Sequence, residues 1–219
     1  MDMENNNWRD LAPLHSGLTN VRSVLVQCDT AFQLSKQLKI ILVENNLNYI
    51  ESGISKHHLR FSLIGVGYYS EFLNTLSNSV SQGLAGSESC DVSLPNDNYP
   101  YWLAHMGEGH SASFTMPQNC DTKGMILCVV YLSNPGIDAT ECLTSVLIVN
   151  YTKCTFQIHK RDTVFSFNEE DWHGIISNLG SRDKVEIFVT FGHKLVVKNT
   201  VVYLICGESN DMEMEPAKG

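Results

Sequence analysis

One stretch of the sequence resembles the turn that presents a catalytic serine. Gly109 to Ser113 reads Gly-His-Ser-Ala-Ser, close to the Gly-x-Ser-x-Gly turn in which a sharp strand-to-helix bend exposes the serine hydroxyl. Here the last position is Ser rather than Gly, and the residues that follow alternate as in a strand. We therefore expect Ser111 to begin a strand rather than to act as a nucleophile.

Histidines beside a carboxylate are the second candidate for chemistry. His105 and His110 flank a glycine-rich turn with Glu108 between them, and a His/Glu/His set on a loop could bind zinc. Histidines of a hairpin more often lie at the surface, which is the interpretation we adopt. The seven cysteines form no C-x-x-C pair, so they indicate neither a structural zinc site nor a thioredoxin-type pair. We expect no metal and no cofactor.

Cys128 and Cys206 lie inside apolar runs. Buried, reduced thiols are the expectation for both, because a free cysteine behaves as a small apolar side chain.

An acidic run is the third candidate. Glu169, Glu170 and Asp171 are followed by Trp172 and His173. A glycosidase needs two carboxyl groups that face each other across a cleft, whereas three in a row are typical of a solvated turn. We expect a loop over residues 168–173 that could contact a basic partner, and we expect no catalytic residue in the chain.

Aromatic residues around one proline are the most suggestive local feature. Tyr99, Tyr101 and Trp102 flank Pro100. A large aromatic after a proline turn commonly packs into the end of a sandwich, and we expect Trp102 to be part of the core. An exposed platform that stacks on sugars or contacts a protein is the alternative.

Composition excludes several classes of protein. Hydrophobic residues make up 43% and charged residues 18%, with a formal net charge of -9. The first two values are typical of a globular chain, and the acidic charge argues against nucleic acid as the main partner. No apolar run is long enough to cross a bilayer, and the polar start does not resemble a secretory signal. We expect a cytoplasmic protein, with the nucleus as a further location.

The first part of the chain mixes strand and helix patterns. Val21–Gln27 and Leu59–Val66 read as strands, and Ala31, Leu34, Leu38 and Ile41 form a helical stripe that Asp29 could cap. A second helical face follows Ser70. We expect residues 1–86 to be an α/β adapter, with one degenerate leucine-rich unit at residues 18–28 as an interpretation of its start.

The second part is rich in strand patterns. The predicted strands are Cys90–Leu94, Tyr101–His105, Ala112–Met116, Met125–Leu132, Leu143–Tyr151, Thr155–His159, Thr163–Phe167, Val185–Phe191 and Val201–Cys206. Many short strands with Gly, Pro and Asn turns between them predict a mainly β fold, an antiparallel sandwich of the jelly-roll or Ig-like kind over residues 87–207. Residues 208–219 read as a flexible acidic tail.

A resemblance to a known family rests on this second part. Residues 94–117 follow the order Leu-Pro, a short gap, Pro-x-Trp, a Gly turn, an alternating strand and a closing Pro. This order is similar to that of the C-terminal jelly-roll/Ig-like domain (C-JID) that follows the leucine-rich repeats of plant TIR-type NLR disease-resistance proteins. Residues 123–130, 183–187 and 201–205 resemble later strands of that domain. The chain as a whole looks most like legume proteins of the type called tobacco mosaic virus resistance protein N-like.

The resemblance implies a role in innate immunity. In that family the domain helps the repeats bind a pathogen effector, and binding drives receptor oligomerisation. This chain shows neither the TIR domain, which cleaves NAD in such receptors, nor the nucleotide-binding domain, so neither activity is carried over, and we expect a fragment or a truncated product. Asn96 stands where the family has Gly, a position whose left-handed backbone Asn tolerates.

The expected partners are therefore an effector protein and the adjacent leucine-rich repeats, with no nucleic acid, no membrane, and oligomers formed only through the missing domains. Residues expected in the contacting loops are Tyr99, Tyr101, Glu108, His110, Asp138, Glu141, Glu169, Glu170, Asp171 and His173, and those expected in the core are Trp102, Phe114, Cys128, Val130, Ile187, Val189 and Leu204. A carbohydrate-binding jelly roll and a purely structural cap of a repeat solenoid stay open as alternatives.

Overall fold

A computed structural model describes residues 23–44, 58–67, 74, 76–82, 101–118, 121–133, 144–161, 169–191 and 195–207. The elements, in chain order, are β1 (Ser23–Gln27), α2 (Ala31–Glu44), β2 (His58–Gly67), β3 (Tyr101–Glu108), β4 (Ser111–Thr115), β5 (Thr122–Ser133), β6 (Thr144–Asn150), β7 (Thr155–Arg161), α4 (Glu169–Ser177), β8 (Lys184–Phe191) and β9 (Val196–Cys206). A further helical turn covers residues 76–82.

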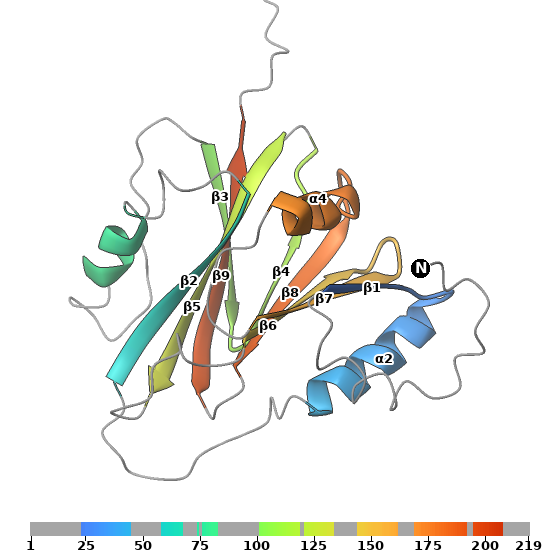
Figure 1. Ribbon diagram of the computed structural model, residues 1–219, viewed down its shortest axis with the longest axis horizontal. Helices are drawn as coiled ribbons and strands as arrows, with labels where there is room; N and C mark the ends of the chain where they lie inside the picture. The colour runs from blue at the N-terminus through green and yellow to red at the C-terminus, as the bar shows by residue number, and fades with distance from the viewer. Residues whose placement is uncertain are drawn as a thin grey trace, which may run out of the picture.

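The strands form two antiparallel sheets. One has the order β1-β7-β6-β8-β4 and the other β2-β5-β9-β3, and Figure 1 shows them as two layers with α2 beside the first. The fold is therefore mainly β, an antiparallel sandwich, as the sequence predicts. Strands β1 and β2 precede residue 87 yet pair with β7 and β5. The described part of residues 1–86 thus contributes strands to both sheets and is not a separate adapter attached to them.

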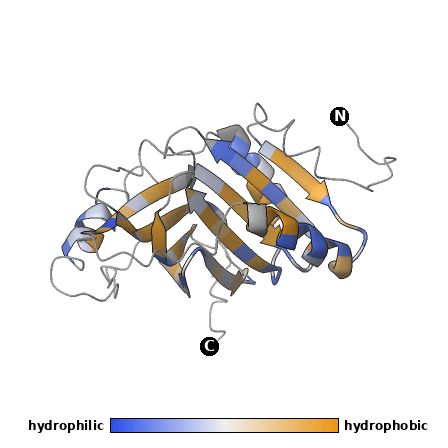
Figure 2. Ribbon diagram, turned by 90° about the horizontal axis from the view of Figure 1, so that it is seen from below, coloured by the Kyte–Doolittle hydropathy of each residue, from blue (hydrophilic) through white to orange (hydrophobic). Residues whose placement is uncertain are grey.

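The main core lies between the two layers. Alternate residues of β5, among them Met125, Leu127 and Val129, face Ile148 and Ile187 of the other sheet within one buried cluster. Hydrophobic colour dominates most strands in Figure 2, and each fully buried aliphatic side chain contributes about 1.5–3 kcal/mol. The remaining residues expected in the core, apart from Trp102, are buried too: Phe114, Cys128, Val130, Val189 and Leu204.

From Gly124 to Tyr131, strand β5 is buried on both faces. Its other face, which carries Ile126, Cys128 and Val130, is covered by Leu76 and Val80 of the 76–82 helical turn. This double cover explains why the sequence from Met125 to Tyr131 is apolar throughout rather than alternating, as expected for a central strand.

Helix α2 covers the outer face of the first sheet. Leu34 and Leu38 pack on Val149 and Phe156. Thr30 directly precedes the helix, and its hydroxyl accepts a hydrogen bond from the backbone amide of Gln33 at 3.2 Å, so Thr30 rather than the predicted Asp29 is the N-cap.

Two glycines let the chain cross from one sheet to the other between β3 and β4. A Cβ on Gly107 would lie 1.9 Å from the carbonyl oxygen of Ser111, and Gly109 has φ +68. Two hydrogen bonds hold this corner. The backbone amide of Gly109 donates to the carbonyl of Lys198 at 2.7 Å, and the Thr200 hydroxyl donates to the carbonyl of Gly109 at 2.8 Å. The close approach excludes a side chain at Gly107, and the positive φ at Gly109 favours glycine there.

The loop predicted over residues 168–173 is wrong from Glu169 onward, because helix α4 begins there. Trp172 and Ile175 are buried in the main core, so burial of these two side chains outweighs the acidic run that suggested a solvated turn. Helix α4 also covers the polar inner side of β7, where Gln157 Nε2 donates to the carbonyl of Gly174 at 2.9 Å.

Three further expectations meet the structure here. Strand β1 is antiparallel to β7 of the sandwich, so this segment is paired with a sandwich strand and not with a neighbouring repeat. Cys206 is disulfide-bonded, which corrects the expectation of a reduced thiol. Cys128 is buried and carries a reduced thiol, as the sequence predicts. The expected strands Cys90–Leu94 and Thr163–Phe167 and the acidic tail lie outside the described residues.

Candidate recognition surface

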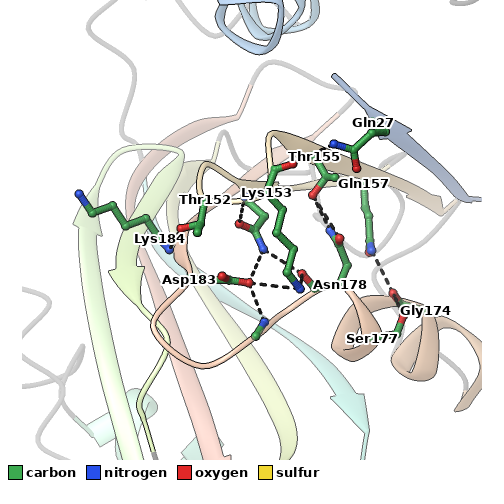
Figure 3. A network of polar contacts seen from close by, with 12 residues as sticks. Gln27, Thr152, Lys153, Thr155, Gln157, Gly174, Ser177, Asn178, Asp183 and Lys184 are labelled. Atoms are coloured by element: carbon green, nitrogen blue, oxygen red, sulfur yellow. Dashed lines mark hydrogen bonds and ion pairs between the residues drawn. The ribbon is translucent and has the colours of Figure 1, made fainter. Parts of the chain in front are cut away.

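The turn between β6 and β7 is fixed by a buried polar network (Figure 3). Asn150, which is fully buried, donates its side-chain amide to Asp183 Oδ2 at 2.7 Å and to the carbonyl of Asn178 at 2.8 Å. The same carboxylate oxygen accepts the amide of Gly180 at 2.7 Å and lies 3.4 Å from Lys153 Nζ. These contacts join the β6–β7 turn to the segment between α4 and β8, and so hold α4 in place.

Asp183 carries its charge within this network. Burial alone would raise the pKa of its carboxyl group, but hydrogen bonds from Asn150 and Gly180 together with the Lys153 ammonium lower it below its ordinary value. The network has its donors matched to acceptors, so it is a structural clamp.

The network also bears on the glycosylation pattern Asn150-Tyr151-Thr152. Because both protons of the Asn150 amide are engaged in a buried site, the folded protein cannot accept a glycan at this residue.

Ser111 meets a carboxylate rather than a base. Its hydroxyl donates to Glu186 Oε1 at 2.8 Å, and the Tyr151 hydroxyl donates to Glu186 Oε2 at 2.6 Å. Burial, with the hydrogen bond to Glu186 and its negative charge, raises the pKa of Tyr151. The neighbouring His110 places Nδ1 3.1 Å from the carbonyl of Val189. This arrangement anchors β4 to β8 and does not activate the serine.

The two histidines of the zinc interpretation have separate surroundings. His105 stacks on Phe114 with ring centroids 4.6 Å apart, and its Nε2 is buried without a hydrogen-bond partner. Burial lowers the pKa of both His105 and His110, the second partly offset by its bond to Val189. Within the described ranges no group of three His, Cys, Asp or Glu side chains could hold a metal ion.

The predicted contact residues fall in two places. Glu108 is exposed and His110 half-buried at the β3–β4 corner, while His173 is exposed on α4. Asp171, in contrast, is turned inward: its carboxylate lies 3.9 Å from His159 Nδ1, with 9% of the side chain exposed. Asp171 therefore supports α4, and is a poor contact residue.

The remaining predicted contact residues are not placed by the structure. Tyr99, Asp138 and Glu141, and the side chains of Tyr101, Glu169 and Glu170, lie outside the described residues. Trp102 pairs in register with Ile205, and its side chain also lies outside them.

Two large exposed apolar side chains, Phe32 and Leu25, were not singled out from the sequence, whereas Met106 belongs to the predicted contact segment Met106–His110. Phe32 on α2 is 79% exposed, Leu25 on β1 59% and Met106 on β3 51%. The sequence does contain a signal for the first: Phe32 lies off the helical stripe of Leu34 and Leu38 that faces the sheet. No helix of the described ranges is long and apolar enough to cross a membrane.

Comparison with known proteins adds no identification. No protein-family profile, curated protein or solved structure matches this chain.

Proposed function

We propose that this chain is a protein-recognition domain, the C-terminal β-sandwich of a plant immune receptor of the TIR-type NLR class, which contributes to binding of a pathogen effector. The observation that carries the proposal is the exposure of Phe32, Leu25 and Met106 on a frame whose own core is closed. Aromatic side chains and Met are enriched at protein interfaces.

The residues of the resemblance support the class of fold more than the partner. Gly109 is at the corner with φ +68, Phe114 is in the core, and residues 123–130 belong to the central strand β5. These positions specify a frame, and the partner is chosen by side chains on its surface.

The proposed location is the cytoplasm, with the nucleus as a further site, and the proposed second partner is the set of adjacent leucine-rich repeats. Disulfides are rare in the reducing cytoplasm, so the redox state of Cys206, which is disulfide-bonded in this structure, tests the proposed location. Thiol alkylation of the protein in intact plant cells, followed by mass spectrometry, shows whether Cys206 is reduced or oxidised. A reduced Cys206 supports the cytoplasm, and a fully oxidised Cys206 refutes it.

Co-precipitation tests the function itself. The chain alone and the chain fused to its repeats are compared for capture of candidate effectors. Glu108→Lys and His173→Glu, both at exposed positions, should weaken capture while the melting temperature stays unchanged, and Thr115→Lys on the edge of β4 is the matched control. If neither form captures an effector, the proposal is refuted. If all variants capture it equally, the assignment of the contact residues is refuted.

The sugar-binding alternative depends on Trp102. Titration with oligosaccharides of Trp102→Phe and Trp102→Ala variants against wild type distinguishes it, because stacking on a sugar requires an aromatic ring at this position. A saturable response that Trp102→Ala abolishes would favour a carbohydrate-binding module. The structural-cap alternative predicts that no partner other than the repeats is captured.

A further inference from the structure

The outer face of helix α2 combines apolar and basic side chains. Phe32, Lys36 and Ile40 are spaced four residues apart and so form one line on the helix, with Lys39 beside them. All four are exposed, Phe32 by 79% and Ile40 by 37%. The opposite face, with Leu34 and Leu38, packs on the sheet. We call these four residues the α2 outer face.

The charge of this face is opposite to that of the protein. The chain has a net charge of -9, yet no Asp or Glu occurs from Ala31 to Val43. If two copies paired through this face, their lysines would oppose one another, and like charges in contact are unfavourable. The face is therefore unsuited to a symmetric dimer and complementary to an acidic partner.

We propose that the α2 outer face docks an acidic, amphipathic segment of a partner protein, with Phe32 packed among the apolar side chains of that segment and Lys36 and Lys39 beside its carboxylates. This inference rests on the proposed function of partner recognition and adds the surface and the chemistry. A large aromatic at the centre with charges at the edge is the usual arrangement of an interface hot spot.

A defined probe tests the docking surface. A fluorescein-labelled amphipathic peptide with Leu on one helical face and Glu on the others is titrated against the full chain, and fluorescence anisotropy is recorded. Phe32→Ala and the double variant Lys36→Glu/Lys39→Glu should each weaken binding at least about tenfold. Lys198→Glu, an exposed lysine of β9 in the other sheet, should bind as wild type does. Raising the salt from about 0.05 to 0.5 M should weaken wild type more than the double variant.

The outcomes separate this inference from the function on which it rests. Unchanged melting temperatures are expected, because the altered side chains are exposed. Failure of the peptide to bind, equal binding of all variants, or binding of phosphatidylserine vesicles in preference to the peptide would overturn the docking surface. If an effector is captured equally well by wild type and Phe32→Ala, the surface is wrong while the recognition function stands. If no effector is captured but the peptide binds as described, the docking surface stands while the proposed recognition function is wrong.

A second, independent observation concerns two free cysteines. Cys28 follows β1 directly and donates its backbone amide to the carbonyl of Cys154 at 2.9 Å, one step beyond the pair Gln27 and Thr155. Residues opposite each other in an antiparallel ladder have Cα atoms about 4.5–5.5 Å apart, and this hydrogen bond holds Cys28 and Cys154 directly beside the last such pair, near the separation that a disulfide requires. Both residues contact the cluster under α2, so both side chains are on the same side of the sheet.

We also propose that Cys28 and Cys154 form a reversible disulfide with a glutathione-type oxidant. The more accessible Cys154 thiolate attacks oxidised glutathione and releases one reduced glutathione. The Cys28 thiolate then attacks the mixed disulfide and releases the second. Two thiols lose two electrons and two protons in total, and one glutathione disulfide is reduced. The bond would tie β1 and the start of α2 to the β6–β7 turn.

Peptide mass spectrometry without reduction tests this bond. After treatment with oxidised glutathione, wild type and Cys128→Ser should show a peptide that links Cys28 to Cys154, and their melting temperature should rise by about 5 °C or more. Cys28→Ser should stop at a glutathione adduct on Cys154 with no such rise. An adduct in wild type without the cross-link, or a cross-link without any change in melting temperature, would overturn the proposal.

Discussion

Replacement of Asp183 by Asn tests the buried network directly. Asp183 Oδ2 accepts two hydrogen bonds at 2.7 Å, from Asn150 and Gly180. Asparagine keeps an oxygen in that position but loses the charge. Hydrogen bonds to a charged group contribute about 1.5–3 kcal/mol and neutral ones about 0.5–1.5 kcal/mol, so two such bonds lose about 2 kcal/mol together. The ion pair with the half-exposed Lys153 adds at most about 1 kcal/mol.

Removal of the side chain should cost more. Asp183→Ala leaves the buried Asn150 amide without this acceptor, which adds about 1–3 kcal/mol. We therefore expect unfolding free energies about 2–3 kcal/mol lower for Asp183→Asn and about 3–6 kcal/mol lower for Asp183→Ala. Urea unfolding at pH 7, followed by circular dichroism, measures both.

Acid should remove the difference between wild type and Asp183→Asn. The pKa of Asp183 is lowered in the folded protein, so the unfolded chain binds its proton more readily. The stabilisation is complete above the ordinary carboxyl pKa and is lost as the pH falls through the lowered folded value. A cost for Asp183→Asn below about 0.5 kcal/mol, or a difference that does not change between pH 7 and strong acid, would refute the assignment of a charged clamp.

Three further predictions follow from packing. Gly107→Ala should lower the free energy of unfolding by more than about 3 kcal/mol, because its Cβ would lie 1.9 Å from the Ser111 carbonyl oxygen. Gly174→Ala on α4, where nothing lies within 4 Å, should raise the free energy of unfolding by about 0.5–1 kcal/mol. Urea unfolding measures both variants, and equal effects would contradict the prediction. Trp172→Ala should cost about 3–5 kcal/mol in the same assay, and a loss under about 1 kcal/mol would show that α4 does not close the core. When the chain is expressed through a secretory route, intact-mass analysis should find natively folded protein without a glycan at Asn150, and a glycosylated folded fraction would contradict the buried amide.

Local patterns carried the prediction of the sandwich. The apolar run from Met125 to Tyr131 indicates a strand covered on both sides, and the alternation of Val185, Ile187 and Val189 indicates a face in the core. The glycines at 107 and 109 mark the corner. These features depend on backbone geometry and on burial of neighbouring residues, and therefore appear in the sequence at short range.

Helix α4 and the candidate surface could not be predicted in this way. Thr155, Gln157 and His159 alternate as polar residues on β7, which reads as a solvent-facing side, but all three are buried. They are covered because α4 lies over them, with Gln157 bonded to the carbonyl of Gly174. The contact joins segments whose proximity no local pattern encodes.

The sequence by itself determined the class of fold, the central strand and the glycine corner, because period, polarity and φ requirements are properties of a few consecutive residues. Only the tertiary structure decided that Asp171 faces inward and that Cys28 lies opposite Cys154. Each of these depends on which distant segment covers a given face, and that choice is made by the packing of the whole chain.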